Sequence, residues 1–451
     1  MRPRGPATEA AASGDDRTRL GRAQAPCVAD CRYVGVTEFE RQSDAGGRRQ
    51  CGHPAPGLLS QVIGHGAHAV SLTRLSTNTV HLGTLAAWYI REVAACDVSV
   101  IVPTLNEEDA LAALLQDLRR QTGVRLEVLV ADGGSDDATA AIAESFDFAS
   151  VVTCERGRGR QMNRAACEAL GTYLCFLHAD TRVPSDGLLK AARDSMAAEQ
   201  RATGHDRLAG HFQLEFIRAD PRKHAVAFRY AEEKMSFDRP HVVNGDQGLL
   251  LTPGFFAALG GFDESMGFLE DQKIAAEIRR QGRWVLLPGK MQTSARRFEA
   301  AGFHRLYILM SIIQAMYWAG AREFFDRAPG IYRQQQEVGK LLLTPFFREI
   351  TRMFREDYGV VGTARLLVRV GRFVRSHSWQ MFYFFDIVLR PISGPCRYPF
   401  LRFHDAVFWK FTNFRVFDAV TAVLTVGWFL CVLFPVYAIL DRRELRSAAA
   451  G

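Results

Sequence analysis

Polar side chains that could bind a nucleotide and a metal ion stand where buried strands are predicted to end. Residues 104–107 (T-L-N-E) follow the first of these strands, Asp132 follows the second, and His178 and Asp180 end the fourth. Carboxylate oxygens hold hard divalent cations, which can bridge a diphosphate, so Asp180 beside His178 predicts a Mg²⁺ or Mn²⁺ site. Asp132 can accept hydrogen bonds from a base or a ribose. Each residue alone fits a turn or a helix cap, but their grouping favours a binding site.

Two further groups could act on a phosphorylated substrate. Arginines at 156, 158 and 160 lie in a Gly/Arg-rich loop and could bind phosphate oxygens, and Arg296 and Arg297 are a second such pair; a solvated basic surface is the alternative. Glu270 and Asp271 stand at a predicted helix start, where a carboxylate could take a proton from an attacking hydroxyl. The alternative is a capping pair favoured by the helix dipole.

Short apolar runs alternate with helical patterns from about residue 97, which predicts a doubly wound, mixed but mostly parallel sheet flanked by helices. In such sheets ligands bind outside the carboxyl ends of the strands, which is where the polar residues fall. The predicted strands are the run Ser99–Glu107, which ends in a Pro-containing turn, then Leu126–Asp132, Val151–Thr153, Tyr173–Asp180, 211–216, a loop running into a strand over 244–252, and 284–288. The predicted helices cover about 108–121, 138–145, 161–170 and 270–282.

The C-terminal third differs in composition and predicts contact with a membrane. Residues 301–415 are aromatic-rich with interleaved arginines, as in amphipathic, interfacial helices. Ala419–Leu440 is 22 residues without a charge, about 33 Å as a helix, so 416–442 predicts a transmembrane helix before a short tail, 443–451. A buried core helix is the alternative. Both flanks are basic, so charge gives no orientation.

Composition excludes several protein classes. The chain has 451 residues, 48% hydrophobic and 23% charged, which excludes a wholly disordered chain, a collagen or a small disulfide scaffold. Its net charge of +7 fits an anionic substrate or membrane face and does not require nucleic acid. Residues 1–95 lack periodicity and predict a disordered or poorly structured extension. The predicted nucleotide site lacks a P-loop and a G-x-G-x-x-G turn, which disfavours ATP hydrolysis and hydride transfer.

Five ordered motifs resemble those of a family 2 glycosyltransferase with the GT-A fold, over residues 97–300. They are S-V-I-V-P-T-L-N-E, A-D-G-G-S-D-D-A-T, F-L-H-A-D-T-R-V-P, G-G-F-D-E and L-E-D. The segments G-R-G-R-Q-M-N-R-A-A, N-G-D-Q-G and S-A-R-R-F-E further resemble a bacterial subgroup labelled arsenosugar-biosynthesis glycosyltransferases. The resemblance implies a nucleotide-sugar donor, a divalent metal and an acceptor hydroxyl.

The resemblance also implies roles for residues at matching positions. The nucleoside pocket would be lined by Pro103, Thr104, Asn106 and Glu107. Asp132 would contact the base or ribose, Asp180 would replace the last Asp of the D-x-D metal motif, and Asp271 would be the catalytic base. The chain departs from the usual pattern at His178, where the first metal-binding Asp is common, and at Gly133, where many relatives have a second Asp.

Together these observations predict an inverting glycosyltransferase at a membrane, with its catalytic domain (96–300) in the cytoplasm. The departing diphosphate would be stabilised by the metal at Asp180, aided by Arg160 or Arg296, and Asp246 and Gln247 are candidate acceptor contacts. The acceptor would be lipid-linked or otherwise held at the membrane. Two alternatives remain: a nucleotidyltransferase, and a non-catalytic membrane protein whose transferase-like domain binds a nucleotide or a partner.

Overall fold

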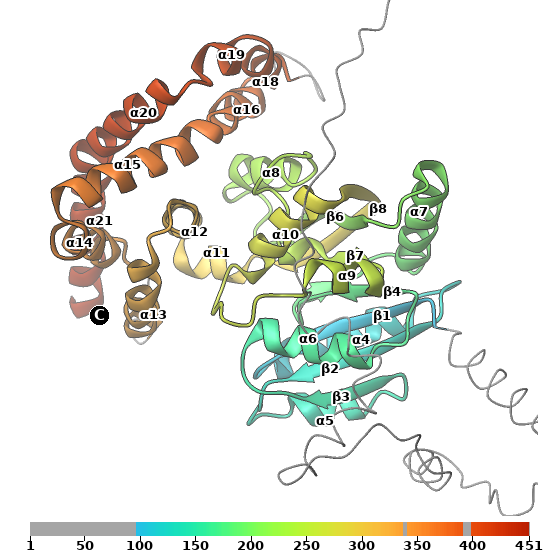
Figure 1. Ribbon diagram of the computed structural model, residues 1–451. Coiled ribbons are helices and arrows are strands. Elements are labelled where there is room, and N and C mark those ends of the chain that lie inside the picture. The colour runs from blue at the N-terminus through green and yellow to red at the C-terminus, as the bar shows by residue number, and fades with distance from the viewer. Residues whose placement is uncertain (1–95, 337–340, 391–397, 451) are drawn as a thin grey trace, which may run out of the picture.

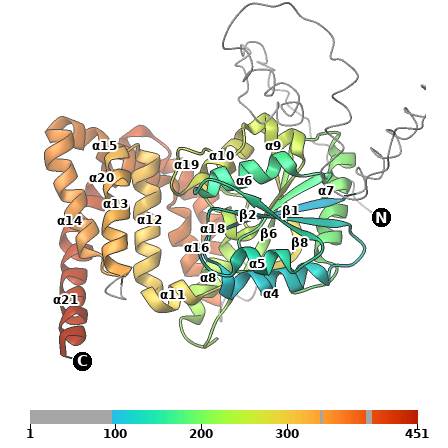
Figure 2. The same ribbon diagram turned by 90° about the horizontal axis from the view of Figure 1, so that it is seen from below.

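A computed structural model describes residues 96–336, 341–390 and 398–450. Figures 1 and 2 show a sheet domain beside a group of C-terminal helices. The extension predicted over residues 1–95 lies outside the described residues.

The sheet has eight strands in the order β3-β2-β1-β4-β7-β6-β8-β5. The first four are parallel; β7 is antiparallel to β4 and β6, β6 and β8 are parallel, and β5 is antiparallel to β8. This confirms the predicted mixed, mostly parallel sheet. The strands are β1 (Val98–Thr104), β2 (Leu126–Asp132), β3 (Ala149–Thr153), β4 (Tyr173–Phe176), β5 (Thr181–Arg182), β6 (Leu208–Ile217), β7 (Leu249–Leu251) and β8 (Arg283–Ser294).

Helices cover both faces of the sheet, because the strands bury side chains alternately on each side. On β1, Val100 and Val102 point into one core and Ile101 into the other. The first core is closed by α4 (Glu108–Arg119), α5 (Thr139–Glu144), α7 (Leu188–Thr203) and α8 (Ala225–Lys234). The second is closed by α6 (Arg158–Glu168), α9 (Pro253–Leu259) and α10 (Glu270–Gln281).

Several strand boundaries differ from the sequence prediction, and two of them have a clear reason. The strand predicted to reach Asp180 ends at Phe176, so His178 and Asp180 lie in the turn that follows β4. The strand predicted over 284–288 extends to Ser294, because β8 pairs with β6 along a ladder that resumes after an irregularity near His211. Both differences occur where an apolar run and the hydrogen-bonded ladder do not end at the same residue.

The C-terminal helices form a further core of their own and contact the sheet domain at α8, among other places. They are α11 (Arg296–Ala301), α12 (Phe303–Ala319), α13 (Arg322–Gln336), α14 (Thr344–Met353), α15 (Gly359–Ser376), α16 (Trp379–Val388), α18 (Pro399–Phe403), α19 (Trp409–Thr412), α20 (Arg415–Trp428) and α21 (Phe434–Ala450). Tyr230 of α8 packs against Tyr383 of α16, and Glu233 forms an ion pair with Arg390 at 2.5 Å. The sheet domain and the helices therefore share a packed, charge-paired boundary.

Leu114 tests whether α4 is held by its apolar face. It is fully buried, with Leu111, Leu115 and Leu118 on the same face, so Leu114→Ala should lower the free energy of unfolding by about 2–5 kcal/mol. Leu170→Ala, at a half-exposed leucine, should cost less than about 0.5 kcal/mol. Denaturant unfolding followed by tryptophan fluorescence measures both; equal effects would contradict this packing.

Candidate active site at the carboxyl ends of the strands

The loops after β1 and β2 are tied together by side-chain to backbone hydrogen bonds. The Asn106 side chain accepts from the Asp136 backbone N–H at 3.0 Å, and the Asn106 backbone N–H donates to the Ser135 hydroxyl at 2.9 Å. Asn106 has a positive φ of 57°, which an asparagine tolerates better than most residues. The predicted nucleoside residues after β1 therefore lie beside Asp132 at the end of β2.

Asp132 organises this pair of loops. Its carboxylate accepts hydrogen bonds from the Gly134 backbone at 3.0 Å, the Ser135 backbone at 2.9 Å and the Thr104 hydroxyl at 3.2 Å. Although burial opposes its ionisation, the hydrogen bonds from Ser135, Gly134 and Thr104 hold the pKa of Asp132 below its usual range. Asp132 is thus an ionised, buried anchor of the loop.

The missing second acid at position 133 has a steric reason. Gln161 of α6 donates to the backbone oxygens of Thr104 and Ala131, both at 2.7 Å, and so fastens α6 to the ends of β1 and β2. A Cβ at Gly133 would lie only 3.0 Å from the Gln161 side-chain amide. An aspartate at this position would require Gln161 to move. Sequence reasoning missed Gln161, whose importance depends on this packing.

A chain of charged and polar groups crosses the site from α6 to the turn before β7. The guanidinium of Arg158 pairs with Glu270, whose side chain is 1% exposed, and lies 3.2 Å from His178 Nε2. His178 Nδ1 lies 2.8 Å from the Asp246 carboxylate. Because arginine only donates, we assign Nε2 as an acceptor and place the ring proton on Nδ1, directed at Asp246.

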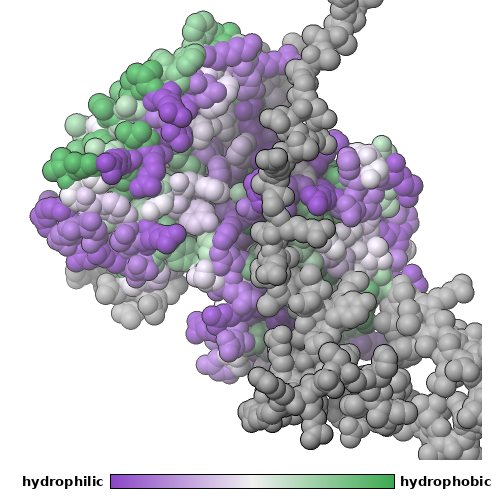
Figure 3. Space-filling view, viewed as in Figure 1, coloured by the Kyte–Doolittle hydropathy of each residue, from purple (hydrophilic) through white to green (hydrophobic). Residues whose placement is uncertain are grey.

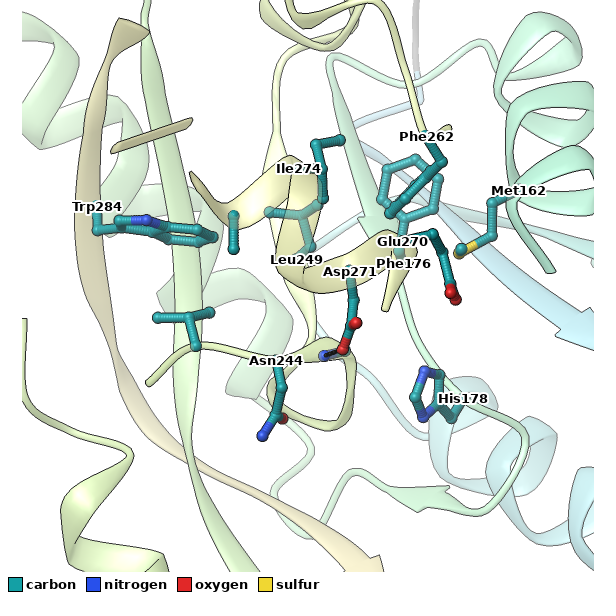
Figure 4. A pocket seen from close by; sticks show the side chains of 13 residues that line it. Met162, Phe176, His178, Asn244, Leu249, Phe262, Glu270, Asp271, Ile274 and Trp284 are labelled. Atoms are coloured by element: carbon teal, nitrogen blue, oxygen red, sulfur yellow. Dashed lines mark hydrogen bonds between the residues drawn. The ribbon is translucent and has the colours of Figure 1, made fainter. Parts of the chain in front are cut away.

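Asp271 faces the same space from the start of α10 (Figure 4). One of its carboxylate oxygens accepts the Gly245 backbone N–H at 2.8 Å and the other accepts the Gln272 N–H at 2.8 Å. A Cβ at Gly245 would lie 2.7 Å from His178 Nε2, so only glycine allows this approach. Leu269, which precedes α10, has a positive φ of 66°, and this strained residue directs the following two carboxylates into the site.

Glu107 and Asp180 form the second acidic group of the site. Burial and the neighbouring charge of Asp180 raise the pKa of Glu107, while Arg297 and Arg296 oppose that rise. Both arginines lie at the start of α11, just beyond the end of β8. The charges of Arg296 and Arg297 therefore act on Glu107, and their phosphate-binding role stays a prediction.

His178 and Asp180 were predicted to bind a divalent cation, but the surroundings of His178 do not fit that role. Both ring nitrogens have protein partners, and the partner of Nε2 is itself a cation, so a metal there would have to displace Arg158. Among the residues described, no three His, Cys, Asp or Glu side chains converge as ligands. Asp180 makes no hydrogen bond or ion pair to another described residue, which leaves one carboxylate available. We derive no step through a metal at this site.

Two predicted contacts are placed differently by the structure. Arg160 pairs with Glu155 at 2.8 Å on an exposed surface, while Arg158 points into the site. The two are separated by two residues of α6, a rotation of about 200°, so they cannot face the same way. Gln247, a predicted acceptor contact, is fully buried, and its amide donates to the backbone oxygens of Met235 and Phe212.

The Arg158–Glu270 pair predicts a measurable stability coupling. Arg158→Met leaves the Glu270 carboxylate buried without its cation and should lower the free energy of unfolding by about 3 kcal/mol. This value is at the lower end for buried ion pairs because Arg158 is partly exposed. Adding Glu270→Gln should recover at least half of that loss. Denaturant unfolding of the two single variants and the double variant measures the coupling. Additive losses would show that the two groups do not depend on each other.

Part of the chain is similar in sequence to known proteins. Residues 99–204 match the family described as Glycosyl transferase family 2. The chain is 25% identical over 215 residues to the succinoglycan biosynthesis protein ExoA of Rhizobium meliloti, covering 44% of this chain and 63% of the relative. It is 38% identical over 94 residues to a PGL/p-HBAD biosynthesis glycosyltransferase of Mycobacterium bovis, covering 20% and 37%. Less than two thirds of each relative is therefore matched.

Solved structures show a weaker likeness. Staphylococcus aureus TarS 1-349 in complex with UDP aligns with a TM-score of 0.37 at 20% identity, over 71% of this chain and 90% of that one. Glucosyl-3-phosphoglycerate synthase from Mycobacterium tuberculosis aligns with a TM-score of 0.31 at 19% identity, over 46% and 72%. Scores this low carry no argument, and we rest none on them. Residues 99–204 are therefore similar to glycosyltransferase family 2, and the relatives are matched over part of their length.

Proposed function

We propose that the chain is an inverting glycosyltransferase that moves a sugar from a nucleotide-diphosphate sugar to an acceptor hydroxyl. The family 2 domain and relatives named glycosyltransferases support the reaction class. The observation that carries the proposal is the Asp271 carboxylate, held by the Gly245 backbone N–H and facing the same space as His178 at the end of β4. Asp271 would thus act as the base beside the sheet edge where the donor is expected.

The donor would lie along the ends of β1, β2 and β4. Its nucleoside would rest against the loop after β1, with Pro103 and Thr104 at the strand end and Asn106 and Glu107 beyond it. Asp132 would act by holding the loop that shapes this pocket. The diphosphate would meet the guanidinium groups of Arg158, Arg296 and Arg297, which suit phosphate oxygens. We propose that these cations stabilise the charge that develops on the departing diphosphate.

The chemical step then follows from the position of Asp271. The acceptor oxygen attacks the anomeric carbon from the face opposite the diphosphate, while its proton moves to an Asp271 carboxylate oxygen. The carbon–oxygen bond to the diphosphate breaks, and the leaving group takes the electron pair. Each Asp271 oxygen accepts one backbone hydrogen bond and keeps a lone pair for the proton. The configuration at the anomeric carbon is inverted.

A second cavity, of about 190 Å³, offers a place for the acceptor. It adjoins the Asp271 site through shared walls at Val243, Ala275 and Trp284. Gln272 Oε1 and Trp318 Nε1 are buried without a partner among the described residues, one lacking a donor and the other an acceptor. The Trp284 and Trp318 rings line this cavity, so we propose that a hydroxyl-bearing, ring-containing acceptor packs against them.

The location of this cavity supports an acceptor delivered from a membrane. Trp318 belongs to α12, and its ring contacts that of His241, another residue lining the cavity, with the centroids 4.3 Å apart. The C-terminal helices thus complete the cavity, and the same part of the chain contains a helix long and apolar enough to span a membrane. We propose membrane attachment through that helix and a cytoplasmic catalytic domain, where nucleotide sugars are made. The resemblance to arsenosugar-labelled enzymes stays a prediction about the product.

Asp271→Asn tests the proposed function. The variant should lose about 10²–10⁴-fold in the rate of transfer because the amide cannot accept the proton, while donor affinity changes little. Asp206→Asn, at an exposed aspartate before β6, is the matched control and should keep full activity. Initial rates measure the loss, and NMR of the wild-type product should show the inverted anomer. A fully active Asp271→Asn variant, or a product with retained configuration, would contradict the proposal.

A further inference from the structure

The long apolar helix does not stand alone in the structure. It runs from Arg415 to Ser447 through α20 and α21, about 50 Å, with a mean hydropathy of 2.3 in its most apolar window and only 6% of that window buried. Its first half packs against α15: a Cβ at Gly371 would touch Asp418 and Ala422, and Arg375 binds Asp418 at 2.7 Å and Asn413 at 2.9 Å. These contacts make the two helices antiparallel.

This packing places charged residues of the neighbouring helices at the same height as the apolar run. Arg369 and Arg365 lie two and six residues before Gly371 on α15, level with the first half of the run, and both are exposed. Beside the second half, Phe347 of α14 packs against Phe434 and Tyr437, and its neighbour Arg348 is exposed. If the helix crossed a bilayer with its neighbours in place, these arginines would enter hydrocarbon at about 2.5–3.5 kcal/mol each near the centre.

Buried ion pairs hold both ends of the helix to these neighbours. At one end Asp418, 1% exposed, receives hydrogen bonds from Arg372 and Arg375. At the other end Asp441, 3% exposed, pairs with Arg305 of α12 and accepts the Thr344 backbone N–H at 2.8 Å. Separating the helix from α12, α14 and α15 would leave these buried carboxylates without their partners, which costs several kcal/mol each.

The surface that these helices present has apolar areas with hydrophilic residues interspersed (Figure 3). Side chains that would ordinarily be buried are exposed on several successive helices, including Val361, Phe403, Phe411, Val416, Val423 and Leu424. Residues 359–447 hold 12 Lys and Arg against 5 Asp and Glu, a net charge of 12 − 5 = +7. Three of the five acids, Asp386, Asp418 and Asp441, are buried, so the exposed charge is strongly basic.

We propose that α15 and α18–α21 lie in the plane of an anionic bilayer surface, with the 415–447 helix embedded along its length rather than crossing. The apolar side chains would enter the boundary of the acyl chains, and arginines at 365 and 415 would meet anionic headgroups. This inference concerns a lipid surface and does not depend on the proposed sugar transfer. It places the C-terminus on the same side of the membrane as the catalytic domain.

Vesicle flotation with the full chain tests the surface. Wild-type protein should float with vesicles containing phosphatidylglycerol, and bind pure phosphatidylcholine vesicles at least about tenfold more weakly; added salt should weaken the first interaction. Val423→Asp, at a side chain 73% exposed, should reduce binding about tenfold or more, whereas Leu170→Asp on the sheet domain should not. Equal thermal midpoints would show that both variants fold. Undiminished binding by Val423→Asp, or no flotation of wild type, would overturn the proposal.

The side of the membrane on which the C-terminus lies distinguishes a helix in the membrane plane from a helix that crosses the membrane. In bacterial spheroplasts, an epitope tag after Gly451 should resist external protease until the membrane is opened, as a tag on the catalytic domain does. Protection of both tags supports the in-plane helix. External cleavage of the C-terminal tag alone would show that the helix crosses and would overturn the proposal. Neither result depends on finding the donor or the acceptor.

Discussion

The ion pair between Arg158 and the buried Glu270 is the contact on which the rest of the site depends. It fixes the start of α6 against the start of α10, two helices that belong to different crossover connections of the sheet. The same guanidinium sets the tautomer of His178, and the position of α10 sets the direction of Asp271. A buried carboxylate is costly without its cation, so this contact selects one arrangement of the two helices.

The fold was largely predictable because its strands and helices have clear periods. Leucines at 111, 114, 115 and 118 predict the buried face of α4, and the apolar runs of β1 and β2 predict strands covered on both sides. The end of β4 was not predictable, since its apolar run continues through Leu177 and Ala179 while the ladder stops at Phe176. A hydrophobic run predicts that its residues are buried, but a buried residue need not be hydrogen-bonded to a neighbouring strand.

The sequence predicted which strand ends form the candidate site, but not which individual side chains face it. Residues at the ends of β1, β2 and β4 do come together, as expected for parallel strands. Which arginine enters the site could not be read from G-R-G-R, because it depends on where α6 begins and therefore on helix phase. The engagement of His178 by Arg158 likewise depends on residues 20 positions apart in the chain. A metal role for His178 was inferred from its place beside Asp180 and from the resemblance to the D-x-D motif, and its partners in the structure do not fit that role.

The central claim is that this protein binds a nucleotide sugar, and calorimetric titration tests that binding most directly. The full chain would be titrated with a panel of nucleoside diphosphates and nucleotide sugars, with Mn²⁺ and with a chelator, beside Asp132→Ala. Saturable binding of one nucleotide sugar, lost or strongly weakened in Asp132→Ala because its loop is released, is the predicted result. Failure of every nucleotide to bind the wild type under both conditions would contradict the account and favour a non-catalytic domain.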